Sequence, residues 1–165
     1  MCCNALSLFH QYGRGNQLAA TLDWVQQVLE QRAYIRGSAF YPIPESFLFF
    51  LSRLLPRLEN SRPDMYRKMN DMLKERIKER IGMKADAPGL AMRLLVCEHF
   101  NIRDAPGLKK LMAMQELDGG WELGNLFAYA SKNLSIGNRG VSSALAVDAI
   151  SRCRSWLSLV DCNAT

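Results

Sequence analysis

The sequence predicts an all-α protein, an arc of about three and a half helical hairpins in which inner and outer helices alternate. Three observations lead to this fold class. Apolar residues recur at helical spacing between glycines and prolines. No pair of alternating, β-branched runs is joined by an Asn-Gly or Asp-Gly turn, as a β-hairpin would require. Segments that are apolar on nearly every side alternate with a segment that is strongly two-faced.

The first half of the chain contains four expected helices. Residues 2–12 and 18–35 carry apolar residues at helical spacing, and glycines follow both segments. A third helix begins near Pro44, and we expect Pro56 to kink or end it. Residues 64–81 are mostly polar with one apolar stripe, which predicts an exposed outer helix.

Two further helices are expected to begin with the same five residues. Residues 86–90 and 104–108 both read Asp-Ala-Pro-Gly-Leu. The carboxylate of Asp86 or Asp104 can accept hydrogen bonds from free amides at a helix start, and proline is tolerated in a first turn. The duplication therefore predicts two successive helix starts, as in stacked helical hairpins.

The last expected helix, over residues 140–157, is the most apolar. Over residues 141–150 only two serines and one aspartate are not apolar. Such a helix is expected to be surrounded by others, and residues 47–51 of the third helix have the same character. We therefore expect these two helices to be inner helices.

Composition limits the classes of partner. The 165 residues suit a single domain spanning residues 1–165, with a formal net charge of +5. Opposite charges alternate at i,i+3 over residues 74–80, which is typical of a solvated face, so we expect no nucleic-acid partner. The longest apolar run, residues 47–51, is too short to span a bilayer, so no integral membrane span is expected, while peripheral membrane association stays open.

The cysteines and the N-terminal segment favour an intracellular, cytoplasmic protein. Five cysteines form neither a disulfide framework nor a zinc-binding pattern, since Cys2 and Cys3 are adjacent and Cys97, Cys153 and Cys162 stand alone. The first residues lack the basic and apolar regions of a secretory signal. We expect no metal site and no cofactor.

One loop carries the most specific motif. Residues 115–121 read Gln-Glu-Leu-Asp-Gly-Gly-Trp, a Q-x-x-x-G-x-W pattern between an apolar helix end and the helix expected over residues 140–157. This pattern resembles the QW repeat of the squalene and hopene cyclases, in the terpene cyclase and protein prenyltransferase superfamily. The resemblance, strong over residues 104–152, implies an α/α toroid. It also implies a structural role for Gln115, Asp118, Gly119, Gly120 and Trp121.

The resemblance implies a fold without assigning a catalytic residue. The sequence contains neither the Asp-x-Asp-Asp motif nor the Asp-rich motif of these cyclases. The prenyltransferase zinc site cannot be placed, because Cys97 and His99 point in different directions from a helix. Closing a ring of six hairpins would take ~250 to 300 residues, so we expect a partial toroid, a fragment or short member of the superfamily.

Two charged residues are candidates for ligand binding, each with a structural alternative. Asp148 lies in an apolar segment and would be either a cavity acid or, as we favour, the partner of Arg152 at i,i+4. Arg139, at a helix start, would bind an anionic ligand or, as we favour, the preceding loop.

Aromatic residues form the second group of candidates. They would line a pocket for an isoprenoid or another apolar ligand, although core packing is the commoner role for aromatic residues at these spacings. This group contains Phe50, Trp121, Phe127 and Tyr129, together with Phe47 and Phe49.

Two functions follow from these observations. The leading hypothesis is a cyclase-like or prenyltransferase-like helical domain that binds an apolar, isoprenoid-type ligand, with catalytic motifs not present in this chain. The alternative is a non-catalytic helical-repeat interaction module. Its open edge would pack against a second copy or a partner chain.

Overall fold

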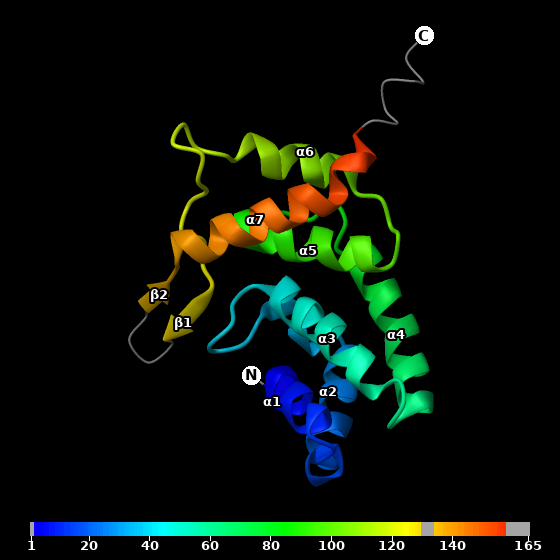
Figure 1. The fold of residues 1–165 in the computed structure, drawn as a ribbon. Helices are drawn as coiled ribbons and strands as arrows, with labels where there is room; N and C mark the ends of the chain where they lie inside the picture. The colour runs from blue at the N-terminus through cyan, green and yellow to red at the C-terminus, as the bar shows by residue number, and fades with distance from the viewer. Residues whose placement is uncertain (1, 130–133, 158–165) are drawn as a thin grey trace.

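The computed structural model describes residues 2–129 and 134–157, which are mostly helical, as the sequence predicts (Figure 1). The α-helices are α1 Cys2–Gln11, α2 Ala19–Glu30, α3 Pro44–Leu58, α4 Pro63–Lys78, α5 Ala87–His99, α6 Ala105–Ala113 and α7 Arg139–Cys153. Short 3₁₀ helices are η1 Gly15–Leu18, η2 Ala33–Arg36 and η4 Arg154–Trp156. Cys162, one of the cysteines considered above, lies outside the described residues.

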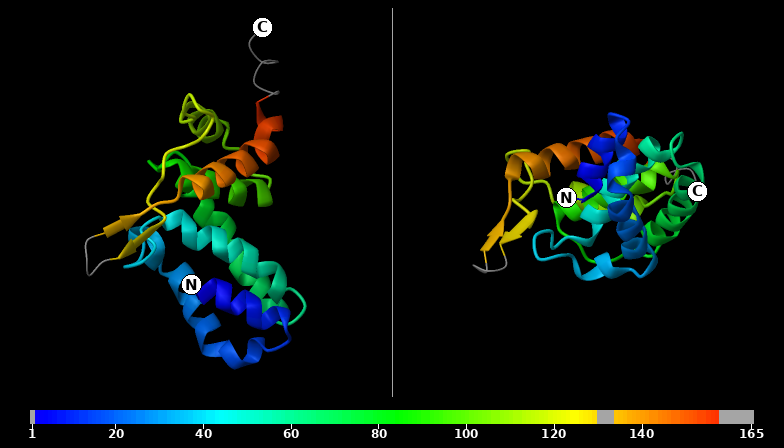
Figure 2. Two further views of the ribbon diagram at one scale, coloured as in Figure 1. Left: turned by 60° about the vertical axis from the view of Figure 1, so that its left-hand side comes forward. Right: turned by 90° about the horizontal axis from the view of Figure 1, so that it is seen from below.

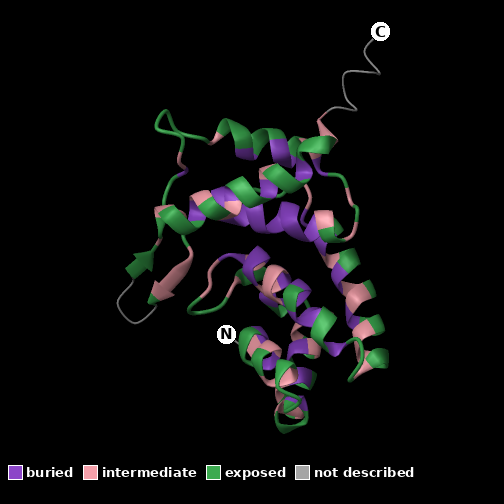
Figure 3. Ribbon diagram, viewed as in Figure 1, coloured by how far each residue is buried: buried purple, intermediate pink, exposed green. Residues whose placement is uncertain are grey.

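Helix α5 is the most buried helix of the described chain. Every residue from Ala87 to Cys97 is buried, and α3, α4, α6 and α7 all pack against α5 (Figure 3). The expectation that residues 140–157 form a surrounded helix is wrong. Helix α7 lies on α5 with one face, so Val141 and Val147 on its other face remain exposed.

Two apolar core clusters meet along α5. The first joins α1, α2, α3 and α4 with Val96 and Cys97 near the end of α5. The second joins the first part of α5 with α6, α7 and Trp121. Figure 2 shows the two groups of helices one above the other, with α5 between them. The arrangement of the helices as part of a toroid stays a prediction.

The two repeated pentapeptides begin helices, as predicted. Asp86 Oδ1 accepts a hydrogen bond from the Gly89 amide at 3.0 Å, and Asp104 Oδ1 accepts one from the Gly107 amide at 2.9 Å. Each aspartate therefore satisfies an amide that has no partner within its own helix.

Two other helix ends differ from the expectation. Helix α2 ends at Glu30 rather than near residue 35, because Arg32 adopts a left-handed conformation with φ of 55° before η2 begins. Helix α3 continues past Pro56 to Leu58, so the proline lies in the last turn and does not end the helix.

A small antiparallel hairpin corrects the expectation of a purely helical chain. Strand β1 (Phe127–Tyr129) pairs with β2 (Leu134–Ile136), with Phe127 opposite Ile136. Each strand has three residues, too few for an alternating pattern to be recognised in the sequence. The Ala128 amide also donates to the Phe40 carbonyl at 2.9 Å, which attaches the hairpin to the segment before α3.

Candidate ligand cavity

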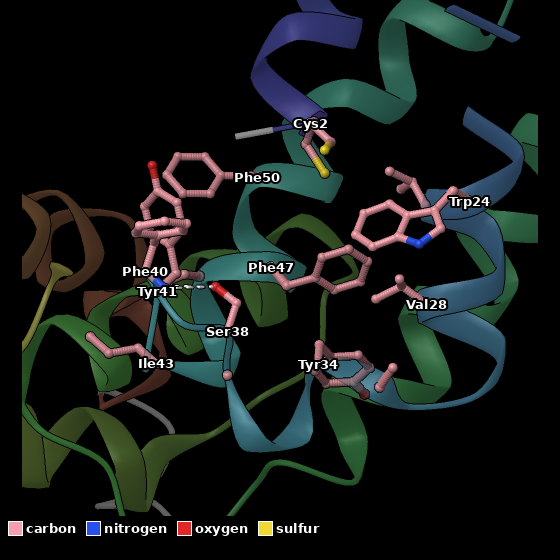
Figure 4. A pocket seen from close by; sticks show the side chains of 15 residues that line it. Cys2, Trp24, Val28, Tyr34, Ser38, Phe40, Tyr41, Ile43, Phe47 and Phe50 are labelled. Atoms are coloured by element: carbon pink, nitrogen blue, oxygen red, sulfur yellow. Dashed lines mark hydrogen bonds between the residues drawn. The ribbon is translucent and has the colours of Figure 1, made fainter. Parts of the chain in front are cut away.

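An apolar cavity of about 440 Å³ lies among α1, α2, η2 and the start of α3 (Figure 4). None of the described residues that line it carries a charged side chain. The lining consists of Cys2, Cys3, Trp24, Val25, Val28, Ala33, Tyr34, Gly37, Ser38, Phe40, Tyr41, Ile43, Ser46, Phe47 and Phe50. The cavity volume falls within the ~300–1,000 Å³ typical of small-molecule sites.

Paired aromatic rings form the walls of the cavity. Tyr34 and Phe47 stack with ring centroids 5.2 Å apart and an interplanar angle of 14°. Tyr41 meets Phe50 edge to face at 6.3 Å. Phe127 from β1 contacts Tyr41 of this second pair edge to face, with the two ring centroids 5.8 Å apart. The walls are therefore held by contacts between rings.

A tight loop before α3 positions Phe40 and Tyr41. Gly37 has a φ of +68°, and a Cβ there would lie 2.6 Å from the Pro42 carbonyl oxygen. The hydroxyl of Ser38 accepts a hydrogen bond from the Tyr41 amide at 3.0 Å (Figure 4). Only glycine fits this backbone conformation and this close approach without strain.

The cavity walls are electrically neutral. Burial raises the pKa of the Tyr34 phenol to about 12, with a further contribution from the charge of Glu79. Burial also raises the pKa of the Cys3 thiol to about 12. Both groups therefore keep their protons at physiological pH. The Tyr34 hydroxyl is buried and has no hydrogen-bond partner among the described residues.

Of the aromatic candidates, Phe47 and Phe50 line the cavity, whereas Phe49 does not. Phe127 does not line it but packs against Phe40 and Tyr41, which do. Tyr129 lies on β1, is 42% exposed and is not a lining residue.

Trp121 lies in the second core cluster, away from the cavity. Its side chain is 1% exposed, and its indole Nε1 donates a hydrogen bond to the Leu111 carbonyl at 2.8 Å. Its amide donates to the Ser143 hydroxyl at 3.1 Å. The residue therefore connects the end of α6 with α7.

The rest of the 115–121 segment forms a self-contained turn. The Gln115 side-chain amide donates to the Gly119 carbonyl at 2.8 Å, and the Gly120 amide donates to Asp118 Oδ1 at 3.1 Å. Gly119 has a φ of +86°, and a Cβ on Gly120 would lie 2.6 Å from Arg139 Nη2. Neither position tolerates a side chain without rearrangement.

Arg139 binds this turn. Its guanidinium contacts the carboxylates of Asp118 and Glu116, the latter at 2.5 Å. The hydrogen bond from Arg139 lowers the pKa of Asp118 to about 2. The positive charge of Arg139 is thus shared between two acids of the preceding loop.

Asp148 lies on the surface of α7. Its carboxylate accepts a hydrogen bond from Arg152 Nε at 2.9 Å, and its side chain is 48% exposed. This is the i,i+4 geometry considered from the sequence. None of Asp148, Arg139 and Trp121 lines the cavity, and a binding role for them stays a prediction.

A buried charged cluster beside the cavity has no signal in the sequence. Glu45 is 1% exposed and accepts hydrogen bonds from Arg80 Nε at 3.0 Å and from Arg93 Nη2 at 3.1 Å. Arg93, also 1% exposed, donates to the Met83 carbonyl at 2.8 Å. The cluster fastens the start of α3 to α5, and sequence separations of 35 and 48 residues hide it from pattern analysis.

Sequence reasoning also missed most of the cavity lining. Trp24 lies on the exposed side of α2, while Tyr34, Phe40 and Tyr41 come from η2 and the loop that follows it. Aromatic residues in a connecting segment have no periodicity that marks them as neighbours.

Neither a cluster of metal ligands nor a membrane-spanning helix occurs among the described residues. Within residues 2–129 and 134–157, no three His, Cys, Asp or Glu side chains gather as metal ligands would. No helix of the described chain has the length and apolar character needed to cross a membrane.

The chain is similar in sequence to a terpene cyclase. It is 41% identical over 152 residues to the drimenol cyclase drtB of Aspergillus calidoustus. The matched residues are 91% of this chain but only 28% of that protein, so the chain spans about 28% of its relative's length. No family model matches the sequence, and no solved structure matches it. The similarity supports a terpene cyclase-like relationship over nearly the whole chain.

Proposed function

We propose that this chain is a helical part of a terpene cyclase-like protein and that its apolar cavity binds the hydrocarbon skeleton of an isoprenoid. The observation that carries the proposal is the cavity of about 440 Å³, walled by paired aromatic rings and aliphatic side chains. The similarity to the drimenol cyclase adds support from sequence.

The chemistry of the lining suits such a ligand. Each square ångström of apolar surface removed from water contributes ~25 cal/mol, and an isoprenoid is apolar along its whole chain. The rings are already packed against one another, so binding would order few additional side chains. A loop fixed by Gly37 and Ser38 adds to this preorganisation.

Binding of farnesol, a linear isoprenoid alcohol, to the 165-residue chain tests the proposal. Val28 lines the cavity, so Val28→Phe fills part of the space and should weaken binding by at least about tenfold. Val147→Phe adds the same side chain on the exposed face of α7 and should leave binding unchanged. Equal binding of farnesol by both variants would show that farnesol does not bind in the cavity.

A second candidate function is an interaction module that pairs with a second copy of itself. The observation in its favour is the exposed side of α7, where the apolar side chains of Val141 and Val147 are 45% and 57% exposed. Two identical faces can cover each other about a two-fold axis. Light scattering of the parent and of Val147→Lys tests it, since a dimer dissociated by this substitution would support pairing, and a monomeric parent would exclude it.

A further inference from the structure

Two adjacent cysteines stand in the wall of the cavity, and the proposed function uses neither of them. Cys2 and Cys3 begin α1 and both line the cavity. Figure 4 shows the Cys2 side chain directed between the rings of Phe50 and Trp24. We propose that Cys2 is a modification site, which takes a fatty acyl group in thioester linkage and places its chain in the cavity. The inference rests on the proposed function in one respect, since the acyl chain would occupy the space assigned there to an isoprenoid and so regulate its binding.

Cys2 differs from the other described cysteines in its exposure. Cys3, Cys97 and Cys153 are buried, whereas Cys2 is only partly buried. Burial raises the pKa of each of the three buried thiols to about 12. Because the thiolate is the nucleophile, these three cysteines stay protonated and unreactive at physiological pH. Among the residues that the structure describes, Cys2 is therefore the cysteine that a reagent can reach.

The cavity beside Cys2 suits a saturated hydrocarbon chain. It has a volume of about 440 Å³, and none of the described residues that line it carries a charged side chain. Phe47, Phe50 and Trp24 present aromatic rings to this space. Each CH₂ group that moves from water to such a wall favours binding. Binding of the chain would hold the acyl carbonyl near the Cys2 sulfur, which raises the effective concentration of the two reacting groups.

The reaction is an exchange between two thioesters and needs no oxidant or reductant. The Cys2 thiolate attacks the carbonyl carbon of a fatty acyl-CoA. A new carbon–sulfur bond forms to Cys2, and the bond to the CoA sulfur breaks. The CoA thiolate that leaves takes up the proton that the Cys2 thiol released. Cysteines of amphipathic helices are known sites for reversible attachment of this kind.

The CoA carrier can remain outside the cavity during this exchange. Trp24 and Phe40 line the cavity but are 53% and 47% exposed, so the cavity reaches the surface at these residues. Arg36 is exposed at the end of η2, next to the lining residue Gly37. Its positive charge, and the formal net charge of +5, favour a carrier that bears phosphate groups.

The test is incubation of the 165-residue chain with decanoyl-CoA or with acetyl-CoA, followed by peptide mapping by mass spectrometry. We expect a decanoyl adduct on Cys2 that neutral hydroxylamine removes, as it removes thioesters. Decanoyl transfer should be at least about tenfold faster than acetyl transfer, because burial of only two CH₂ groups is worth about tenfold in affinity. The mapping also reads Cys162, which lies outside the described residues.

Two pairs of variants locate the reaction. Cys2→Ser should abolish the adduct, whereas Cys3→Ser should retain it, although both residues line the cavity. Val28→Phe fills part of the cavity and should slow decanoyl transfer toward the acetyl rate, while Val147→Phe on the exposed side of α7 should leave both rates unchanged. Acetyl transfer needs little of the cavity, so an unchanged acetyl rate in Val28→Phe shows that the surroundings of Cys2 are intact.

The outcomes separate this inference from the proposed function. Equal decanoyl and acetyl rates, or adducts spread over the cysteines as in the urea-unfolded chain, would overturn the acylation site. A decanoylated chain that binds farnesol as tightly as the unmodified chain would show that the acyl chain lies outside the cavity. Farnesol binding without acylation of Cys2 overturns this inference alone. Acylation of Cys2 in a chain that binds no farnesol overturns the proposed function and supports the acylation site.

Discussion

Trp121 donates its indole hydrogen bond to the carbonyl of Leu111, ten residues earlier in the chain. Leu111 lies in the last turn of α6, and its carbonyl also accepts a hydrogen bond from the Met114 amide at 3.2 Å. The indole thus adds a second hydrogen bond at this helix end, while its ring fills the core between α5, α6 and α7. This contact gives Trp121 a structural role, because it connects the end of α6 to α7. The contribution of Trp121 to the free energy of unfolding can be measured.

Trp121→Ala should lower the free energy of unfolding by ~3 to 5 kcal/mol, because it leaves a cavity in the second core cluster. Trp121→Phe should cost less, since most of the packing remains and mainly the hydrogen bond is lost. Chemical denaturation measures both. Trp24→Ala, at a 53% exposed position, is the control and should have a much smaller effect. A Trp121→Ala variant as stable as the parent would contradict this structural role for Trp121.

Asp118 should contribute to stability above its ordinary pKa of 3.8 and lose that contribution as the pH falls through about 2. The direction follows because Arg139 stabilises the ionised carboxylate only in the folded chain. Asp118→Asn should therefore reduce stability at neutral pH and flatten its dependence on pH between these values. Denaturation curves recorded across that range measure the difference. Parallel pH profiles for variant and parent would refute the coupling.

Glu45→Gln should strongly destabilise the protein, by ~3 to 5 kcal/mol, because it leaves the buried guanidinium of Arg93 without a counter-charge. Glu75→Gln removes one partner of an exposed pair with Lys78 and should cost ~0 to 1 kcal/mol. The two variants make the same chemical change at different depths. Thermal and chemical denaturation of both should separate them clearly, and similar losses would contradict this account of the buried cluster.

The Tyr34 phenol should titrate near pH 12, well above its ordinary value of 10.0. The folded chain then holds a proton that the unfolded chain releases, so stability should fall as the pH rises between these two values. Ultraviolet difference spectra of the parent and of Tyr34→Phe would isolate this phenol. A transition near pH 10 in the folded chain, absent from the variant, would show that Tyr34 is accessible to solvent.

The 165-residue chain should form no product from squalene or farnesyl diphosphate. The sequence contains neither the Asp-x-Asp-Asp motif nor the Asp-rich motif of the cyclases that it resembles. Gas chromatography of extended incubations with added magnesium measures turnover. Any cyclic product above that of heat-inactivated protein would place catalytic residues within this chain.

Local features of the fold were predictable because their causes are local. Asp86 and Asp104 begin helices through hydrogen bonds that span only three residues. The identity of the central helix was not predictable. Helix α5 contains Arg93, which argues against burial until Glu45 is seen beside it. The apolar residues of α7 are compatible with a buried helix, but the part of the chain that the structure describes covers only one face of it.

The cavity was the least predictable feature. Phe50 was identified as a candidate because it lies in an apolar helix, but the cavity also needs residues from α1, α2 and η2. Their convergence depends on how these elements pack. The hairpin was missed for a related reason, since the Ala128 amide finds the Phe40 carbonyl 88 positions earlier in the sequence.

That attachment couples the hairpin energetically to the cavity. Phe127 contacts both Phe40 and Tyr41, so strand β1 packs against residues of the wall without lining the cavity itself. By thermodynamic reciprocity, a ligand that stabilises this wall must stabilise the docked hairpin by the same free energy. The Ala128 amide should accordingly become more protected from hydrogen exchange when the cavity is filled, although it lies on a different segment of the chain.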